Sequence, residues 1–217
     1  MYRTNYIANS RNIYKVLLVA LVLFSLSLFS VFLKPATFLD VSVCLLLFAA
    51  LVAHSMKNNI TIAAFLIVSI AIAAHLLGSL GFYSYFIFGI LGYDKIVHFT
   101  SSFSVGYMVL QSLPKRIKSM RYLISLLIVM GLGSLVEINE FIGAHYFGIN
   151  NGGIFTMNDT LPFIKSDLQR FDTYFDMIFN FAGAMGALLF AKGQNYLPSM
   201  IKNIRNIKIA QVFQLHL

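Results

Sequence analysis

The chain has 217 residues, of which 59% are hydrophobic and only 11% are charged, and its mean hydropathy is +0.79. A soluble domain carries about 25% charged residues, so this chain is too apolar to cover a water-facing surface and is expected to lie largely in lipid. Its net charge of +8 comes from short basic clusters between apolar runs. Such clusters suit anionic lipid headgroups, so no nucleic-acid partner is expected. The single cysteine, Cys44, excludes an intrachain disulfide and any cysteine-rich metal site.

Six apolar runs are long enough to form membrane-spanning helices. The hydrocarbon core of a bilayer is about 30 Å thick and needs about 20 helical residues to cross it. The expected spans are residues 16–33, 38–56, 60–80, 94–113, 122–145 and 172–191. The predicted fold is therefore an all-α, polytopic transmembrane helix bundle, built as a single integral membrane domain over residues 1–217.

The basic residues predict the orientation of this bundle. Most of the 16 lysines and arginines fall in the N-terminal tail, the second and fourth connections and the C-terminal tail. Because positively charged segments stay on the inner side of a membrane, both termini are predicted to be cytoplasmic, in a multi-pass protein of the cell membrane. The basic tail, residues 192–217, is interpreted either as an amphipathic helix on the inner surface or as a frayed end.

The few acidic residues are concentrated in the apolar part of the chain. Of eight carboxylates, five lie in or at the ends of predicted spans: Asp94, Glu137, Glu140, Asp172 and Asp176. A charge at the centre of a membrane helix costs about 2.5–3.5 kcal/mol on insertion scales, so such residues usually face the bundle interior and serve a function.

The predicted orientation places these acids and two histidines at one depth. His75 comes late in an outward-running span, and His98 comes early in the next, inward-running one. The acids likewise fall at the outer ends of the last three spans. Their spacing puts each set on one face of its helix, at i,i+4 for Asp94 with His98 and at i,i+3 or i,i+4 for the others. We therefore expect one polar site, contributed by four helices, in the outer half of the membrane.

A site with this composition favours a bound cation. Carboxylates held close together repel one another unless some are protonated or a cation lies among them. Lys95 is the one obvious counter-charge nearby, and we expect its ammonium group to reach the membrane interface. Oxygen and imidazole ligands suit Zn²⁺, Mn²⁺ or Fe²⁺, whereas Mg²⁺ or Ca²⁺ would use mainly the carboxylates. A divalent metal is therefore the predicted cofactor.

The same residues carry a family resemblance. His75-Leu76-Leu77-Gly78 with Tyr83 and Tyr85 is followed by YDKIVHF from Tyr93, VEINEF from Val136 and DTYFDM from Asp172. These blocks, in this order, resemble the YjdF-type family of small polytopic membrane proteins, and the Asp-Lys-x-x-His block is distantly VanZ-like. The resemblance covers residues 74–189 and implies a multi-helix membrane fold. It makes His75, Asp94, His98, Glu137, Glu140, Asp172 and Asp176 the matching polar positions, and it implies no particular chemistry.

The leading functional prediction is a metal-dependent hydrolase embedded in the membrane, acting on a lipid or lipid-linked substrate at the outer leaflet. The predicted metal ligands are His98, Glu137, Asp172 and Asp176, with His75 as an additional or outer ligand. Glu140 is the candidate general base, and Asp94 is a second candidate catalytic residue.

Other interpretations stay open on the sequence. The acids could relay protons or bind cations in a transporter, or the polar cluster could only fix helix packing. Taken singly, Asp94 and Asp172 also fit helix caps, and His75 fits a hydrogen-bonded core residue. The chain contains no Glu-x-x-His pair of the kind that di-iron bundles use, which argues against that chemistry. The sequence does not predict an oligomeric state.

Overall fold

The computed structural model describes residues 10–34, 37–57, 60–84, 86–87, 91–117, 119–147 and 172–214. Long helices make up nearly all of these residues: α1 (Ser10–Leu33), α2 (Phe38–Lys57), α3 (Ile62–Ser79), α4 (Tyr93–Ser112), α5 (Met120–Phe147) and α7 (Asp172–Gln214). The predicted all-α fold is confirmed over the described residues, apart from a minimal hairpin before α4. The shorter elements are η2 (Phe82–Ser84), β1 (Phe86–Ile87), β2 (Leu91–Gly92) and η3 (Lys115–Ile117).

Four of the helices are long and apolar enough to cross a membrane. They include Tyr14–Leu33, Ile62–Ser79, Met120–Ile142 and Thr173–Gln194. The apolar stretch of α2, Asp40–Ser55, is shorter, and α4 carries Asp94 and Lys95 in its first turn. The structure therefore supports a membrane protein with four clear candidate spans, two fewer than the sequence predicts.

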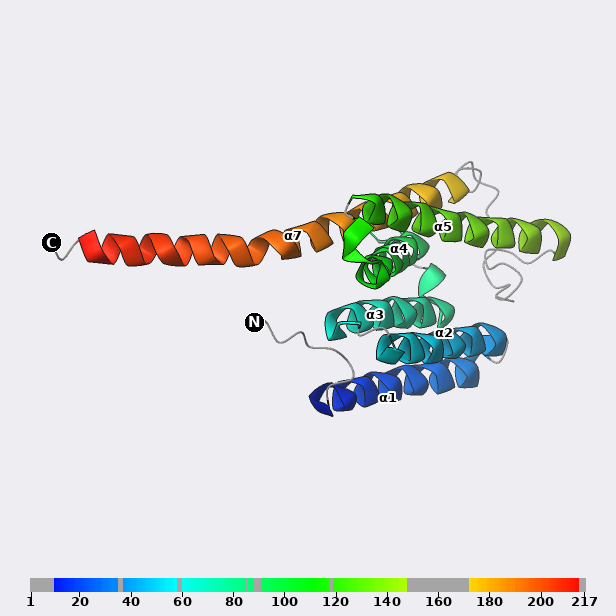
Figure 1. Ribbon diagram of the computed structural model, residues 1–217. Helices are drawn as coiled ribbons and strands as arrows, with labels where there is room; N and C mark the ends of the chain where they lie inside the picture. Colours follow the sequence, from blue (N-terminus) through cyan, green and yellow to red (C-terminus); the bar gives the residue numbers. More distant parts are fainter. Residues whose placement is uncertain are drawn as a thin grey trace.

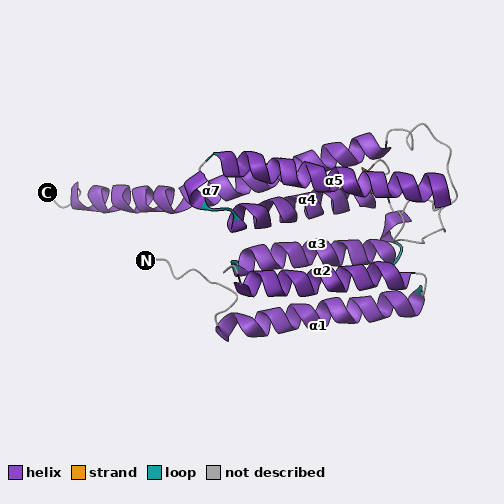
Figure 2. Ribbon diagram, turned by 45° about the vertical axis from the view of Figure 1, so that its right-hand side comes forward, coloured by secondary structure: helices purple, strands orange, loops and turns teal. Residues whose placement is uncertain are grey.

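The helices form two groups of three. Helices α1, α2 and α3 pack on one another, while α4 packs against α5 and α7, and α3 joins the groups through α4 (Figures 1 and 2). Because α4 contacts three other helices, its polar side chains can face protein instead of lipid. This explains how a helix too polar to count as a clear span can occupy the middle of the bundle.

One end of the bundle collects the predicted polar residues. The ends of α3 and α5 and the starts of α2 and α7 lie together, opposite the end where α1 begins (Figure 1). The polar first turn of α4 belongs to the same end, since it directly follows β2 and η2. The sequence-based expectation that these groups share one depth is therefore supported by the helix arrangement.

Small residues bring α4 and α7 close together. A Cβ atom at Gly183 would collide with the main-chain oxygen of Phe99, and one at Gly186 would lie 3.2 Å from the ring of Phe103. Ala187 on α7 is fully buried at the same interface. Membrane helices commonly approach each other through such small residues. Because the two backbones are close here, side chains of α4 and α7 can reach each other one or two turns nearer the start of α7.

The helix ends depart from the predicted spans in two places. Helix α1 begins at Ser10, six residues before the predicted start. Helix α7 continues without a break to Gln214, so the predicted span ending at 191 and the basic tail form one helix. The predicted outer loop after α5 and the side chains of the basic tail from Asn195 onward lie outside the described residues.

Candidate metal centre

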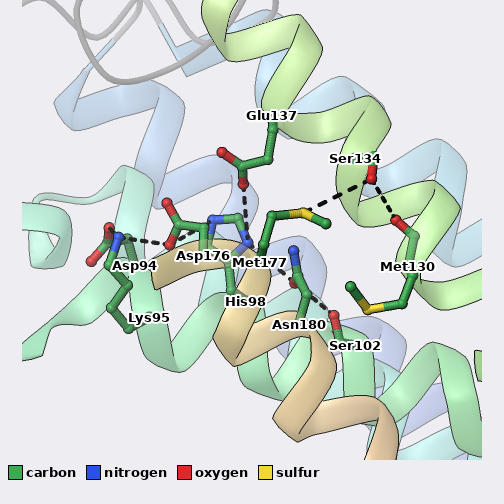
Figure 3. A network of polar contacts seen from close by, with 10 residues as sticks. All are labelled: Asp94, Lys95, His98, Ser102, Met130, Ser134, Glu137, Asp176, Met177 and Asn180. Carbon is green, nitrogen blue, oxygen red and sulfur yellow. Dashed lines mark hydrogen bonds and ion pairs between the residues drawn. The ribbon is translucent and has the colours of Figure 1, made fainter. Parts of the chain in front are cut away.

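Three predicted ligands from three helices meet inside the bundle: His98 of α4, Glu137 of α5 and Asp176 of α7 (Figure 3). One potential ligand atom from each lies within 4.8 Å of the others. The imidazole Nε2 of His98 is 3.4 Å from Oδ1 of Asp176, and its Nδ1 is 3.9 Å from Oε1 of Glu137. Asp176 and Glu137 are 2% and 6% exposed. We call these three residues the His98 cluster.

Lys95 is part of this site, which corrects the prediction that it reaches the membrane interface. The residue is only 7% exposed, and its ammonium nitrogen lies 2.6 Å from Oδ1 of Asp176 and 2.7 Å from Oδ2 of Asp94. A buried ammonium group needs a carboxylate partner to offset its lost hydration. Two carboxylates provide that partner within the bundle, so the long side chain turns inward.

An amide and a hydroxyl group hold His98 from the other side. Asn180 Oδ1 accepts hydrogen bonds from Ser102 Oγ at 2.7 Å and from His98 Nδ1 at 3.3 Å. When Nδ1 carries the proton of a neutral imidazole, Nε2 presents a lone pair to the Asp176 carboxylate. Two acceptors facing each other at 3.4 Å are stable only with a proton or a metal ion between them. The position between these two atoms therefore suits a proton or a metal ion.

The charge of the site matches one divalent ion. Asp94, Glu137 and Asp176 contribute three negative charges when ionised, and Lys95 contributes one positive charge. With His98 neutral, the formal charges of these four groups sum to −2. Buried charge is costly unless it is neutralised. A bound M²⁺ ion would make the site neutral, which is the physical basis for treating it as a metal centre.

The remaining predicted site residues lie around or away from this centre. Glu140 is half-buried on α5, one turn beyond Glu137. Asp172 is the first residue of α7, one turn before Asp176, and its side chain lies outside those described. His75 lies in a second group of candidate ligands, with Asp40 and Cys44 of α2, so the single predicted site is divided into two.

We call Asp40, Cys44 and His75 the Asp40 cluster. His75 Nε2 lies 2.8 Å from Asp40 Oδ1, and His75 Nδ1 lies 2.7 Å from the hydroxyl oxygen of Tyr83. Burial raises the pKa of Tyr83 well above its ordinary value, and the Asp40 and Glu140 carboxylates raise it further. The phenol is thus protonated at neutral pH and can donate to His75, while the opposite nitrogen donates to Asp40.

Sequence reasoning missed Asp40 as a site residue, although a signal was present. In the predicted orientation the second span runs inward, so Asp40 starts at the same outer depth as the other acids. An aspartate near the start of a helix, taken alone, is typical of a residue that caps free N–H groups, and this hides its role as a site residue. The i,i+4 spacing of Asp40 and Cys44, which places both on one face of α2, would have paired the acid with a second potential ligand.

Comparison with known proteins identifies the chain at family level. Residues 13–195 match the family described as "Predicted membrane protein (DUF2238)", so both clusters fall inside the matched region. No curated protein and no solved structure matches the chain.

Proposed function

The chain belongs to this family of membrane proteins. We propose that its His98 cluster binds a divalent metal ion and hydrolyses a lipid or lipid-linked substrate in the membrane. The observation that carries the proposal is the set of three ligand-type side chains, from three helices, that meet inside the bundle, with Glu137 and Asp176 buried. Structural packing alone does not require two carboxylates on one lysine and a third carboxylate beside a histidine. Buried charge destabilises a helix bundle unless it is compensated.

The residues divide into roles that follow from their positions. His98, Glu137 and Asp176 would hold the ion, and Asp172, one turn before Asp176, is a further candidate ligand. An imidazole with carboxylates suits Zn²⁺, Mn²⁺ or Fe²⁺, with Mg²⁺ as the alternative that relies on the carboxylates. When bound, such an ion polarises water and a carbonyl or phosphoryl oxygen.

The neighbouring groups would handle protons and position charges. Glu140 is half-buried and one turn from Glu137, where a carboxylate can take a proton from an attacking water as general base. Asp94 acts through Lys95, since its carboxylate holds the ammonium group that also contacts Asp176. Asp94 is thus proposed as a positioning residue for the charge at the metal centre.

The proposed setting is the outer leaflet of the cell membrane, in a multi-pass protein with both termini cytoplasmic. This orientation depends on the distribution of basic residues along the sequence. Membrane lipids are the proposed partners, with no nucleic acid. The resemblance to the YjdF-type family, and more distantly to VanZ-like proteins, is retained as part of this proposal and adds no reaction to it.

Metal content tests the first half of the proposal. The full chain, purified in detergent and dialysed against Zn²⁺ or Mn²⁺, should retain about one equivalent attributable to the His98 cluster by mass spectrometry. Glu137→Gln and Asp176→Asn together should remove that equivalent. Asp159→Asn, which removes a carboxylate from the predicted outer loop, is the matched control and should leave the metal content unchanged. Equal metal content in all three proteins would contradict the proposal.

Turnover tests the second half. The protein in phospholipid vesicles is incubated with phospholipids and with polyprenyl phosphates or diphosphates, and released headgroup or phosphate is measured with and without added metal. An enzyme should lose turnover in Glu137→Gln while its melting temperature stays close to that of the wild type. Metal binding without any metal-dependent product across this panel would overturn the hydrolase proposal.

A second candidate function, cation transport, is favoured by one observation. Lys95 lies 2.6 Å from Asp176, a proposed ligand, so an entering ion must compete with an ammonium group already in place. Competition between an intrinsic cation and a transported one would allow release as well as binding. Metal uptake into proteoliposomes, measured with an enclosed metal-sensitive dye, distinguishes this function: wild-type uptake that Asp176→Asn abolishes would favour transport over hydrolysis.

A further inference from the structure

The Asp40 cluster has its own set of potential metal ligands, contributed by two adjacent helices. Asp40 and Cys44 are one turn apart on α2, and His75 faces them from α3. One oxygen, one sulfur and one nitrogen atom from these residues lie within 4.8 Å of one another. Asp40 and Cys44 are each 5% exposed, and Cys44 is a free thiol.

The outer atoms of the two polar ligands are held by hydroxyl groups. Ser79 Oγ donates to Oδ2 of Asp40, which leaves Oδ1 directed at His75 Nε2, 2.8 Å away. Tyr83 lies 2.7 Å from Nδ1 of His75, on the far side of the ring. Metal-binding carboxylates and imidazoles are usually fixed in this way by a second hydrogen bond behind the ligand atom. The two inner atoms therefore point at one place.

The position of Tyr83 is fixed by the surrounding residues. Its ring packs so closely on Gly78 that a Cβ atom there would collide with it. The ring also makes edge-to-face contacts with His75 and Tyr93, at centroid distances of 5.9 Å in both cases. Tyr93 in turn donates a hydrogen bond to the main-chain oxygen of Ala74, at 2.9 Å. These contacts hold the hydroxyl group of Tyr83 against His75.

We propose that Asp40, Cys44 and His75 form a second metal site, distinct from the His98 cluster and specific for Zn²⁺ or a similar borderline-soft divalent ion. Thiolate and imidazole ligands select such ions over Mg²⁺ and Ca²⁺. One carboxylate and one thiolate balance the two charges of the ion, so the occupied site is neutral. Three protein ligands leave one position of a tetrahedral ion for water or another small ligand.

Proton release accompanies binding at this site. The Cys44 thiol loses its proton to solvent when the sulfur becomes a thiolate ligand. His75 stays neutral: Nε2 gives up its proton to bind the ion, and Nδ1 takes one up and donates it to the Tyr83 oxygen. The net result is one proton released per ion bound. This proposal does not depend on the proposed hydrolysis at the His98 cluster.

The alternative role for Cys44 is simple packing. The residue belongs to a buried apolar group that includes Val41, Phe48, Phe65 and Leu76, and free cysteine often serves as a small hydrophobic side chain. In that case the thiol would not bind metal at all. The two roles therefore make opposite predictions about one spectroscopic signal.

Titration with Co²⁺ provides that signal. The metal-free full chain in detergent is titrated with Co²⁺, and thiolate-to-cobalt charge transfer is followed by absorption in the near ultraviolet. Because Cys44 is the chain's single cysteine, any such band reports on this residue alone. We expect a band that saturates at about one equivalent of ion and that competing Zn²⁺ removes. Absence of the band in the wild type at saturating Co²⁺ would overturn the proposal.

Variants assign the band to the three ligands. Cys44→Ser should abolish it, while Glu137→Gln should leave it unchanged, because the His98 cluster contains no thiol. Tyr83→Phe should weaken Co²⁺ binding about 10- to 100-fold, as loss of an outer hydrogen bond to a metal ligand typically does. If Cys44→Ser fails to fold, Asp40→Asn and His75→Gln replace it, and a band of undiminished affinity in both would also overturn the proposal.

Discussion

The His98 cluster and the Asp40 cluster hold similar residues in opposite ways. At the His98 cluster, side chains from α4, α5 and α7 meet across three helices, and a buried lysine compensates part of an excess of acid. At the Asp40 cluster, one acid and one histidine from adjacent helices are held by the hydroxyl groups of Ser79 and Tyr83. The first cluster is stabilised mainly by ion pairs around a lysine, whereas the second is stabilised by hydrogen bonds to one carboxylate and one imidazole.

This difference predicts different responses to substitution. Charge interactions in a low-dielectric interior are large, and they leave a costly unpaired ion when one partner is removed. A hydrogen bond between two neutral groups, such as that between Tyr83 and His75, contributes about 0.5–1.5 kcal/mol. Variants of the two clusters should therefore differ in the size of their effects, and four comparisons test this, beginning with the largest.

Asp176→Asn should cause the largest loss of stability. It removes the buried partner of Lys95 and leaves the ammonium group with the partly exposed Asp94. Breaking a buried ion pair on one side costs about 3–5 kcal/mol. The melting temperature of the metal-free protein in detergent measures the loss. Asp94→Asn is the matched control, expected to cost about 1 kcal/mol or less. An equal loss of stability in both variants would show that the Lys95–Asp176 pair contributes no more than the Lys95–Asp94 pair.

Gly183→Ala should separate α4 from α7 and weaken the His98 cluster without a change in charge. The added methyl group collides with the main-chain oxygen of Phe99, and overpacking of this kind costs about 1–3 kcal/mol. Gly131→Ala on α5 meets no atom within 4 Å and should be neutral or stabilising by up to about 1 kcal/mol. Thermal unfolding of both variants checks this, and equal melting temperatures would show that the helices are not held as closely as described.

Tyr83→Phe should have a smaller effect, confined to the Asp40 cluster. It removes the hydroxyl group 2.7 Å from His75 Nδ1 and keeps the ring that packs on Gly78. The loss expected for one neutral hydrogen bond is about 1 kcal/mol. Histidine NMR signals should shift for His75 and stay in place for His98. A shift at both histidines would show that the two clusters are coupled.

The last expected effect is confined to alkaline pH and is absent at neutral pH. Because the pKa of Tyr83 is higher in the folded chain than in the unfolded chain, the unfolded chain releases this proton first as pH rises above about 10. Folding is therefore destabilised in that range by up to about 1.4 kcal/mol per pH unit. Melting temperatures between about pH 9 and 11 should fall less steeply in Tyr83→Phe, and identical slopes would contradict the raised pKa.

Much of this architecture could be predicted from the sequence. Hydropathy and length located the six long helices of the described residues. The orientation argument placed His98, Glu137 and Asp176 at one depth, where the structure joins them. Depth alone could not determine which faces meet. His75 shares the depth but faces α2, because the third helix packs between α2 and α4 and can present its polar residue to only one of them.

Lys95 shows a second limit of sequence reasoning. A lysine at a helix start next to an aspartate is typical of the membrane interface, where the ammonium group reaches water. Its inward direction depends on Asp176, 81 residues later in the chain, and on the close approach of α4 and α7 through Gly183. Neither the pairing nor the small-residue contact can be inferred from local spacing, because both arise from the packing of distant segments.

The unbroken course of α7 has a consequence for how the two ends of the bundle are connected. Its 43 residues extend for about 65 Å at the usual rise of 1.5 Å per residue, more than twice the thickness of a hydrocarbon core of about 30 Å. The helix that begins beside the His98 cluster therefore continues well past the rest of the bundle (Figure 1). One helix joins the buried carboxylate of Asp176 to a segment that projects beyond the opposite end of the bundle. A change in the tilt of α7 beside the His98 cluster would therefore displace that distant segment.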